Sequence, residues 1–147
     1  MTKQDRQQYK LLPHMGDAYI EVRAPNLAGV FERAAFAMFD VMTDPTAIKS
    51  EFTDQFEVTA HDRISLLHDW LEQLLVKFEL DDKVYSTFQV EEIKEQDERG
   101  CLSAKARGGF FKRGHHPAKV EIKAVTYHRM EIVTTARGYV ARYILDL

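Results

Sequence analysis

The sequence predicts an α+β fold: a single domain, residues 1–147, in which two amphipathic helices pack against a mostly antiparallel β-sheet. Two segments carry apolar residues at the three-and-four spacing of a helix that buries one face. In the other regular segments, apolar and polar residues alternate or strand-forming residues are frequent, as in half-buried strands. With 147 residues, of which 45% are hydrophobic, the chain is long enough to bury one core. Residues 1–10 are expected to form a flexible tail.

The first strand and the first helix are read from clean patterns. In residues 17–23 the apolar side chains fall on one face, and Asp17 heads the polar face. A helix is predicted to begin at Pro25-Asn26 and to end at Thr43-Asp44-Pro45. Its apolar stripe consists of Leu27, Val30, Phe31, Ala34, Ala35, Met38, Phe39 and Met42.

The second half of the pattern is a strand, a helix and a run of strands. Residues 52–60 return to a period of two, and Asp62 is expected to cap the helix that follows. The apolar parity of the later strands switches between Ile122 and Val125, which predicts a bulge or a sharp bend. The later strands are predicted near 84–92, 101–107, 118–125, 126–134 and 138–146.

The composition limits the classes of function. A formal net charge of −3 argues against a protein that coats nucleic acid through bulk electrostatics. The basic segment 107–116 is either a solvated flexible loop or a contact for a partner or RNA, and its His115-His116 pair is typical of a surface rather than of a chelate. The single cysteine, Cys101, excludes an internal disulfide and is interpreted as structural. No segment approaches a membrane span and no signal peptide is evident, so a cytoplasmic protein without membrane contact is expected.

The end of the chain carries the clearest chemical signal. Asp146 lies next to the α-carboxylate of Leu147, at the end of an apolar run that must be packed. Two carboxylates held close together repel each other unless a cation neutralises them, and Ca²⁺ and Mg²⁺ prefer oxygen ligands. The C-terminus is therefore a candidate site for a hard cation.

Two further groups of residues are candidates if the last strand pairs with the first. His14 and Asp17 would then lie near Asp146; the alternative is that Asp17 caps a turn and Asp146 faces solvent. Lys123 and His128 mark a second candidate surface. Their alternative is an exposed strand lysine and a hydrogen-bonded histidine at the start of a strand.

Several blocks of sequence together resemble the archease family of accessory proteins of tRNA splicing and RNA repair. The resemblance covers about residues 11–147, and the blocks occur in the family's order and spacing. The family's opening His-Thr-Ala-Asp appears here as His14-Met15-Gly16-Asp17, which keeps the histidine and the aspartate and changes the two residues between them. The other blocks are Val30 to Phe39, Leu66-Leu67-His68-Asp69-Trp70-Leu71, Glu121 to His128, and Ile144 to Leu147.

The resemblance implies a function without catalysis by this chain. Archease assists the RtcB-type RNA ligase, which joins RNA ends in a GTP- and metal-dependent reaction, by promoting guanylylation of the ligase and multiple turnover. By the family's pattern, Asp17, Asp146 and the carboxylate of Leu147 would hold a divalent cation, Ca²⁺ first, with Mg²⁺ or Mn²⁺ as alternatives. Lys123 would be a functional surface residue, with His14 and His128 as further candidates for the partner surface.

Two other functions remain open from the sequence. The family is also associated with a chaperone role for a tRNA-modifying enzyme, such as a tRNA methyltransferase. A metal-dependent hydrolase or nuclease would use His14, Asp17, His128 and Asp146. Against an enzyme stands the lack of a positioned general base, of a basic substrate groove and of a nucleophile or phosphate-loop motif.

Overall fold

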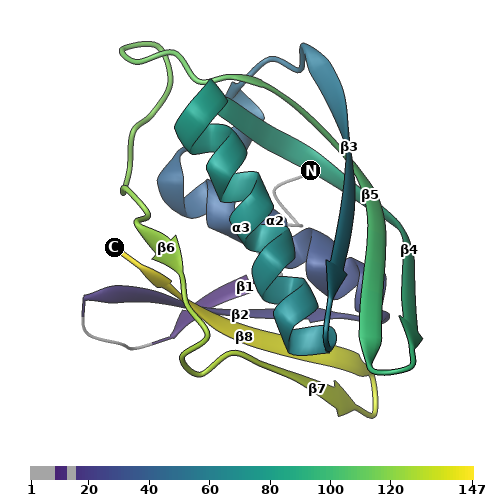
Figure 1. Cartoon of the computed structure of the whole chain (residues 1–147). Helices are drawn as coiled ribbons and strands as arrows, with labels where there is room; N and C mark the ends of the chain where they lie inside the picture. Colours follow the sequence, from purple (N-terminus) through teal and green to yellow (C-terminus); the bar gives the residue numbers. More distant parts are fainter. Residues whose placement is uncertain (1–8, 13–15) are drawn as a thin grey trace.

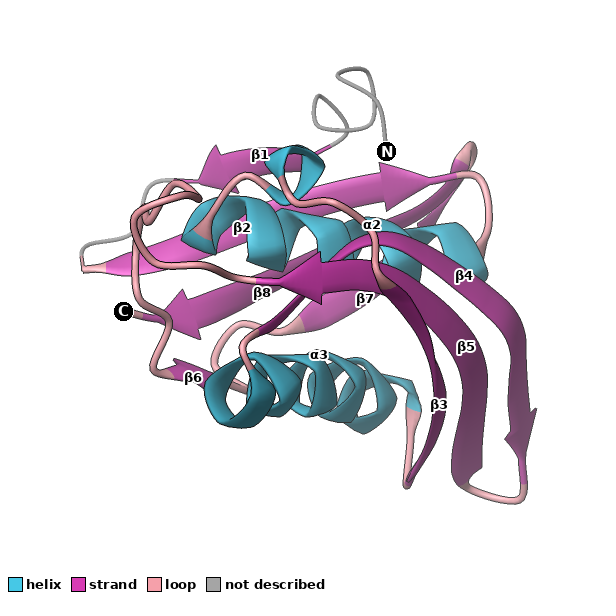
Figure 2. Ribbon diagram, turned by 90° about the horizontal axis from the view of Figure 1, so that it is seen from above, coloured by secondary structure: helices cyan, strands magenta, loops and turns pink. Residues whose placement is uncertain are grey.

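Two long helices lie between two antiparallel sheets in the protein's structure, a computed structural model that describes residues 9–12 and 16–147 (Figures 1 and 2). Helix α2 (Leu27–Met42) contacts strands of both sheets, and helix α3 (Arg63–Asp81) contacts the smaller sheet as well as the edge of the larger one. The α+β class with two helices is confirmed. The helices, however, form a middle layer instead of covering a single sheet.

The five-stranded sheet is organised around the last strand, β8 (Gly138–Asp146). One edge of β8 pairs with β2 (Asp17–Ala24), which in turn pairs with β1 (Tyr9–Leu12). The remaining edge of β8 is shared by two short strands, β6 (Ala124–Val125) and β7 (Glu131–Thr135). Strand β8 is therefore interior to the sheet.

The three-stranded sheet contains the longest strands. Its order is β3 (Phe52–Ala60), β5 (Arg99–Phe110), β4 (Lys83–Gln96). Strands β4 and β5 form a hairpin that turns at Asp97 and Glu98, both with positive φ. A short 3₁₀ helix, Pro45–Ala47, leads from α2 towards β3.

The helices begin where the sequence predicts, because side-chain caps satisfy their first N–H groups. The Asn26 side chain accepts a hydrogen bond from Gly29 N (2.8 Å), and the Asp62 side chain accepts one from Ser65 N (2.7 Å). The apolar stripes of both helices are buried. They meet at Trp70, whose indole Nε1 donates to the carbonyl of Phe31 (3.0 Å).

Four sequence predictions of local structure are wrong. Tyr9 and Lys10 belong to β1 and not to a flexible tail, while residues 1–8 lie outside the described part of the chain. In the predicted strand 118–125 only Ala124 and Val125 pair with β8. Ala124 lies opposite Asp146, the last residue of β8, so the residues before Ala124 have no residue of β8 opposite them. The main chain of this segment bonds elsewhere, since Lys119 N donates to Met42 O (2.9 Å).

The other two corrections concern segments around turns. The predicted strand 126–134 is shortened to β7, since a turn at 127–130 (Tyr127 O accepts from Met130 N, 3.1 Å) separates β6 from β7. The basic segment 107–116 is not a loop throughout, because residues 107–110 are the end of β5. Gly108 and Gly109 are buried there, and a Cβ on either would collide with the main chain of Val84 or Lys49.

Among the described residues, none of the helices has the length and apolarity needed to cross a membrane.

Candidate metal and partner site

The two candidate aspartates lie directly opposite each other. Asp17 is the first residue of β2 and Asp146 the last of β8, and the antiparallel register pairs them. Directly opposed residues project from the same face, with Cβ atoms about 5 Å apart. The next pair, Ala18 and Leu145, faces the core, so the two carboxylates stand on the outer face of the sheet.

Strand β6 fixes Asp146 from its other side. Ala124 also pairs with Asp146, and the N–H of Lys123 donates to the carbonyl oxygen of Asp146 (2.7 Å). Thr126 anchors the following residues through a hydrogen bond from its N–H to the carbonyl of Ile144 (3.2 Å). Lys123 is exposed, so it presents a cationic side chain from a segment that is hydrogen-bonded to the aspartate strand.

The last residue is also packed. Leu147 is half-buried and its side chain contacts the hydrophobic core, although it lies outside β8 itself. Packing of the side chain restrains the position of its carboxylate next to Asp146. Asp17 and Asp146 are both half-buried, and Figure 1 shows the C-terminal end of β8 beside β6. We refer to Asp17, Asp146 and Leu147 as the acidic tip.

Strand pairing does not join His128 to the acidic tip. His14 lies outside the described residues. His128 is exposed and lies in the turn between β6 and β7, beyond the rung that joins Asp17, Asp146 and Ala124. The structure therefore brings the main chain of Lys123 to Asp146, but the strand pairing does not place His128 beside it.

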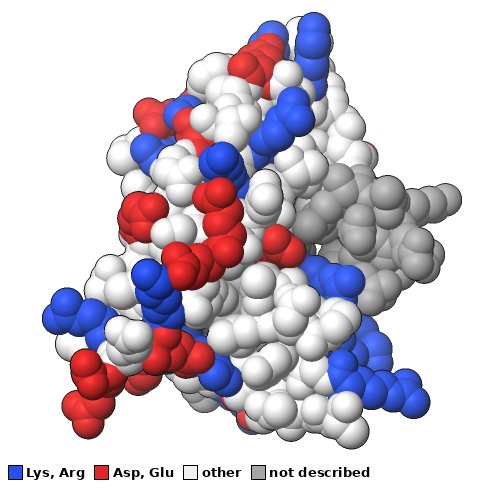
Figure 3. Space-filling model, turned by 90° about the vertical axis from the view of Figure 1, so that its right-hand side faces the viewer, with Lys and Arg blue, Asp and Glu red and all other residues white. Residues whose placement is uncertain are grey.

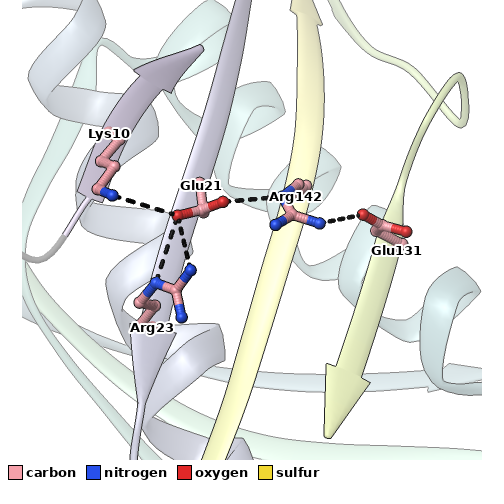
Figure 4. Close-up of polar contacts among 5 residues, drawn as sticks. All are labelled: Lys10, Glu21, Arg23, Glu131 and Arg142. Atoms are coloured by element: carbon pink, nitrogen blue, oxygen red, sulfur yellow. Dashed lines mark hydrogen bonds and ion pairs between the residues drawn. The ribbon is translucent and has the colours of Figure 1, made fainter. Parts of the chain in front are cut away.

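A buried glutamate ties the strands of the tip together (Figure 4). Glu21 is 5% exposed and lies opposite Arg142, whose Nε donates to its carboxylate (2.8 Å). Arg23 donates to the other oxygen (3.3 Å), and Lys10 from β1 lies 3.9 Å from it. Arg142 also donates to Glu131 on β7 (2.6 Å). The network thus crosses four adjacent strands, β1, β2, β8 and β7.

The electrostatics of this network favour a charged glutamate. Burial by itself raises the pKa of Glu21, but the hydrogen bonds and charges of Arg142 and Arg23 outweigh burial and hold the pKa below its ordinary value of 4.5. Glu21 and Arg142 occupy the same sheet face as the tip, four residues along each strand, or about 14 Å away. That distance exceeds the screening length of about 8 Å, so Arg142 fixes the strand register without neutralising the tip.

Sequence reasoning missed Glu21 and Arg142 as a pair. It placed Glu21 on the polar face of its strand, where an exposed position is the ordinary expectation. The sequence did contain the information needed to find this pair. If Asp17 is placed opposite Asp146 in an antiparallel pairing, Glu21 falls opposite Arg142.

The outer face of the three-stranded sheet carries both signs of charge (Figure 3). Lys105 lies 3.7 Å from Glu91, and Lys94 lies 3.6 Å from Glu92. Neighbouring charges neutralise one another on this face, unlike the single-sign stripe of a nucleic-acid-binding surface. A hollow of about 370 Å³ at one end of the sheet is lined by Lys94, Gln96 and other residues that are not in the acidic tip.

Comparison with known proteins assigns the family. The model of the archease protein family matches residues 9–147. This chain belongs to the archease family. It is 39% identical over 139 residues to the archease of Methanosarcina mazei, with 95% of each chain covered. It is 43% identical over 122 residues to the archease of Methanothermobacter thermautotrophicus, with 83% of this chain and 86% of the relative covered.

Solved structures of similar proteins have the same fold. The solution structure of Methanobacterium thermoautotrophicum protein 1598 superposes with a TM-score of 0.80 at 37% identity, covering 96% of this chain and 99% of that one. The crystal structure of an archease from Thermotoga maritima, described as a possible chaperone, superposes with a TM-score of 0.58 at 13% identity, covering 94% and 96%. At 13% identity the Thermotoga archease supports the fold alone.

Proposed function

We propose that this archease is a non-enzymatic accessory factor of an RtcB-type RNA ligase. It promotes the GTP-dependent guanylylation of the ligase, so that each ligase molecule completes many rounds of joining in tRNA splicing or RNA repair. The observation that carries the proposal is the pairing of Asp17 with Asp146 next to Lys123, at the ends of hydrogen-bonded strands. These are the residues that the family's pattern marks as functional.

The donor set of the acidic tip suits a hard divalent cation. Asp17, Asp146 and the carboxylate of Leu147 offer oxygen atoms alone, which favours Ca²⁺, Mg²⁺ or Mn²⁺ over softer metals. Ca²⁺ takes six to eight oxygen ligands, so these three groups leave positions for water or for a partner's atoms. A cation held in this way supplies a positive charge that a ligase cleft containing nucleotide phosphates would recognise.

The residues of this chain would position that charge and recognise the partner. Asp146 is held between β2 and β6, so its carboxylate is presented without first ordering a flexible tail. Lys123 offers a second charge from the adjacent segment. The tip then acts either by adjusting the ligase's metal site or by binding more tightly to the ligase conformation that is ready for guanylylation, because a partner shifts an equilibrium only through differential affinity.

The experiment that tests this proposal is a count of ligation products per ligase. A matched RtcB-type ligase is incubated with cyclic-phosphate RNA, GTP and Mn²⁺ or Mg²⁺, with and without this archease. We expect product to rise well above one per ligase with the wild type and to stay near one with Asp146→Asn. The matched control is Glu92→Gln, which removes the same charge from an exposed site on β4 and should stimulate like the wild type. Full stimulation by Asp146→Asn would rule out the acidic tip as the active element.

A chaperone role is the second candidate, because this chain belongs to the archease family and one member of that family, the Thermotoga archease, is described as a possible chaperone. Here the client would be a tRNA-modifying enzyme. This role predicts that the archease keeps such an enzyme soluble on heating while leaving the turnover of an active cognate ligase unchanged. The ligase count and a light-scattering assay on the enzyme therefore separate the two functions.

A further inference from the structure

A second group of potential metal ligands lies on α3, apart from the acidic tip. It consists of His68, Asp69 and Glu72, and one ligand atom from each lies within 4.8 Å of the others. His68 is 8% exposed, whereas Glu72 is exposed and stands four residues, about one helical turn, further along the helix. In the described part of the chain, no other three His, Cys, Asp or Glu side chains gather in this way.

The contacts of His68 determine which ring nitrogen can bind a metal together with Asp69 and Glu72. Nε2 lies 3.0 Å from the carbonyl oxygen of Val125, which only accepts, so Nε2 carries the hydrogen. In the neutral ring Nδ1 then bears a lone pair, and it lies 3.0 Å from Oδ1 of Asp69. Without a metal, a proton on Nδ1 makes this contact a hydrogen bond to Asp69, and a metal ion bound between the two atoms would replace that proton.

The geometry matches a shared metal ion. Two ligands bound at about 2.1 Å and at a right angle to each other lie about 3.0 Å apart, which is the separation of Nδ1 and Oδ1. Glu72 reaches the same position through a rotatable, exposed side chain. The hydrogen bond from Nε2 to Val125 is the outer contact that characteristically orients a metal-binding histidine.

The surroundings of His68 support this interpretation. The ring of Tyr127 stacks on the imidazole, with centroids 3.9 Å apart and planes 9° from parallel. Tyr127 shields one face of the imidazole from water, and the helix holds His68 and Asp69 on a rigid element. A preoriented imidazole requires little reorganisation when a metal binds.

We propose that His68 Nδ1, Asp69 and Glu72 bind a divalent transition metal of the Zn²⁺ type. Imidazole nitrogen favours Zn²⁺, Co²⁺ or Ni²⁺ over Ca²⁺ and Mg²⁺, so this site is chemically distinct from the all-oxygen acidic tip. Three protein ligands leave the remaining coordination positions to water or a partner's group. The proposal is independent of the proposed ligase function, because it rests on residues outside the acidic tip.

Calorimetric titration with Zn²⁺ tests the site when excess Mg²⁺ is present to occupy the acidic tip. We expect one Zn²⁺ per wild-type chain and at least tenfold weaker binding to Glu72→Gln and Asp69→Asn. The matched control is Glu79→Gln, an exposed charge removed from the same helix two turns away, which should bind like the wild type. Equal affinities of the wild type and both ligand variants would overturn the proposal.

Nitrogen NMR of the imidazoles identifies the histidine that binds. On addition of Zn²⁺, we expect Nδ1 of His68 to shift to a metal-bound value while Nε2 keeps its proton, both in the wild type and in Asp146→Asn. Retention of protons on both nitrogens of His68 at saturating Zn²⁺ would show that a proton fills the gap, and the proposal would fail. It would fail equally if the shifts appeared only at other histidines, such as His115 and His116.

Discussion

A single buried carboxylate connects most strands of the larger sheet. Glu21 lies at the centre of the network with Arg142 and Arg23, and its lowered pKa shows that the folded state prefers the charged form. Removing a buried charged group that accepts hydrogen bonds from arginine nitrogens costs on the order of 2 kcal/mol. The exposed partner of the same arginine, Glu131, has 45% of its side chain exposed and should matter much less.

We expect Glu21→Gln to lower the free energy of unfolding by about 2 kcal/mol near neutral pH, and Glu131→Gln to lower it by less than about 1 kcal/mol. The stabilisation from a carboxylate with a lowered pKa is present above its ordinary pKa of 4.5 and is lost as pH falls through the lowered value. Urea unfolding at a series of pH values measures the destabilisation by each substitution and its dependence on pH. The difference between wild type and Glu21→Gln should shrink in acid; a constant difference would contradict the assigned charge.

The acidic tip makes a second prediction at the scale of single residues. Ca²⁺ should raise the melting temperature of the wild type, since a ligand that binds only the folded state at 100 times its Kd adds about 2.7 kcal/mol. Asp146→Asn should lose this response. In metal-free buffer the same variant should melt at or above the wild-type temperature, because it removes one of two adjacent like charges. A clear loss of stability without metal would show that Asp146 has a structural role.

At the scale of elements, the two helices are joined by a buried hydrogen bond as well as by packing. Trp70 is fully buried, stacks edge-on against Phe56 (5.6 Å between centroids) and donates to Phe31. This contact lies in the core, away from the acidic tip. A substitution there therefore tests whether a loss of stability alone affects ligase stimulation.

We expect Trp70→Phe to destabilise the protein by about 3 kcal/mol through the cavity and the lost hydrogen bond. Below its lowered melting temperature, the folded variant should stimulate the ligase like the wild type. Thermal unfolding by circular dichroism and the count of products per ligase measure the two effects on one sample. Loss of stimulation in the folded variant would connect the helix contact to the tip.

Sequence reasoning succeeded for elements whose pattern is local. Both helices and the strands Phe52–Ala60 and Gly138–Asp146 follow from periodicity and from the caps Asn26 and Asp62. It failed where the partner decides the structure. Residues 118–123 alternate like a strand, but β8 ends before it could pair with them. Strand β1 is four residues long, which is too short for a period to be read.

The candidate site was predictable only in part, for the same reason. The residues Asp17, Asp146 and Lys123 were identified from the sequence, but their proximity depends on the order of strands in the sheet, which no local pattern encodes. The metal role of the tip stays a prediction. His68 was present in a recognised block, but its importance appears only with Val125 and Asp69 around it.

At the scale of the whole molecule, the proposed metal role of the acidic tip includes the α-carboxylate of Leu147. A C-terminal extension after Leu147 leaves every side chain unchanged but converts the α-carboxylate into an amide. We expect such an extension to abolish ligase stimulation while changing the melting temperature little, because Asp146 keeps its pairing with β2 and β6. The control is the same extension at the N-terminus. Undiminished stimulation by the C-terminally extended protein would exclude the terminal carboxylate as a ligand.

The interior position of β8 has a consequence for synthesis on the ribosome. Strands β1, β2, β6 and β7 are all made before β8, yet β2, β6 and β7 each pair with it. The larger sheet therefore cannot assemble before β8 has been made, and until then its earlier strands have unpaired edges, which are prone to aggregation. The hairpin of β4 and β5 and the two helices, in contrast, are complete earlier and can form first. Folding of this archease is thus expected to finish in one late step, in which the arrival of the last strand both closes the sheet and creates the tip.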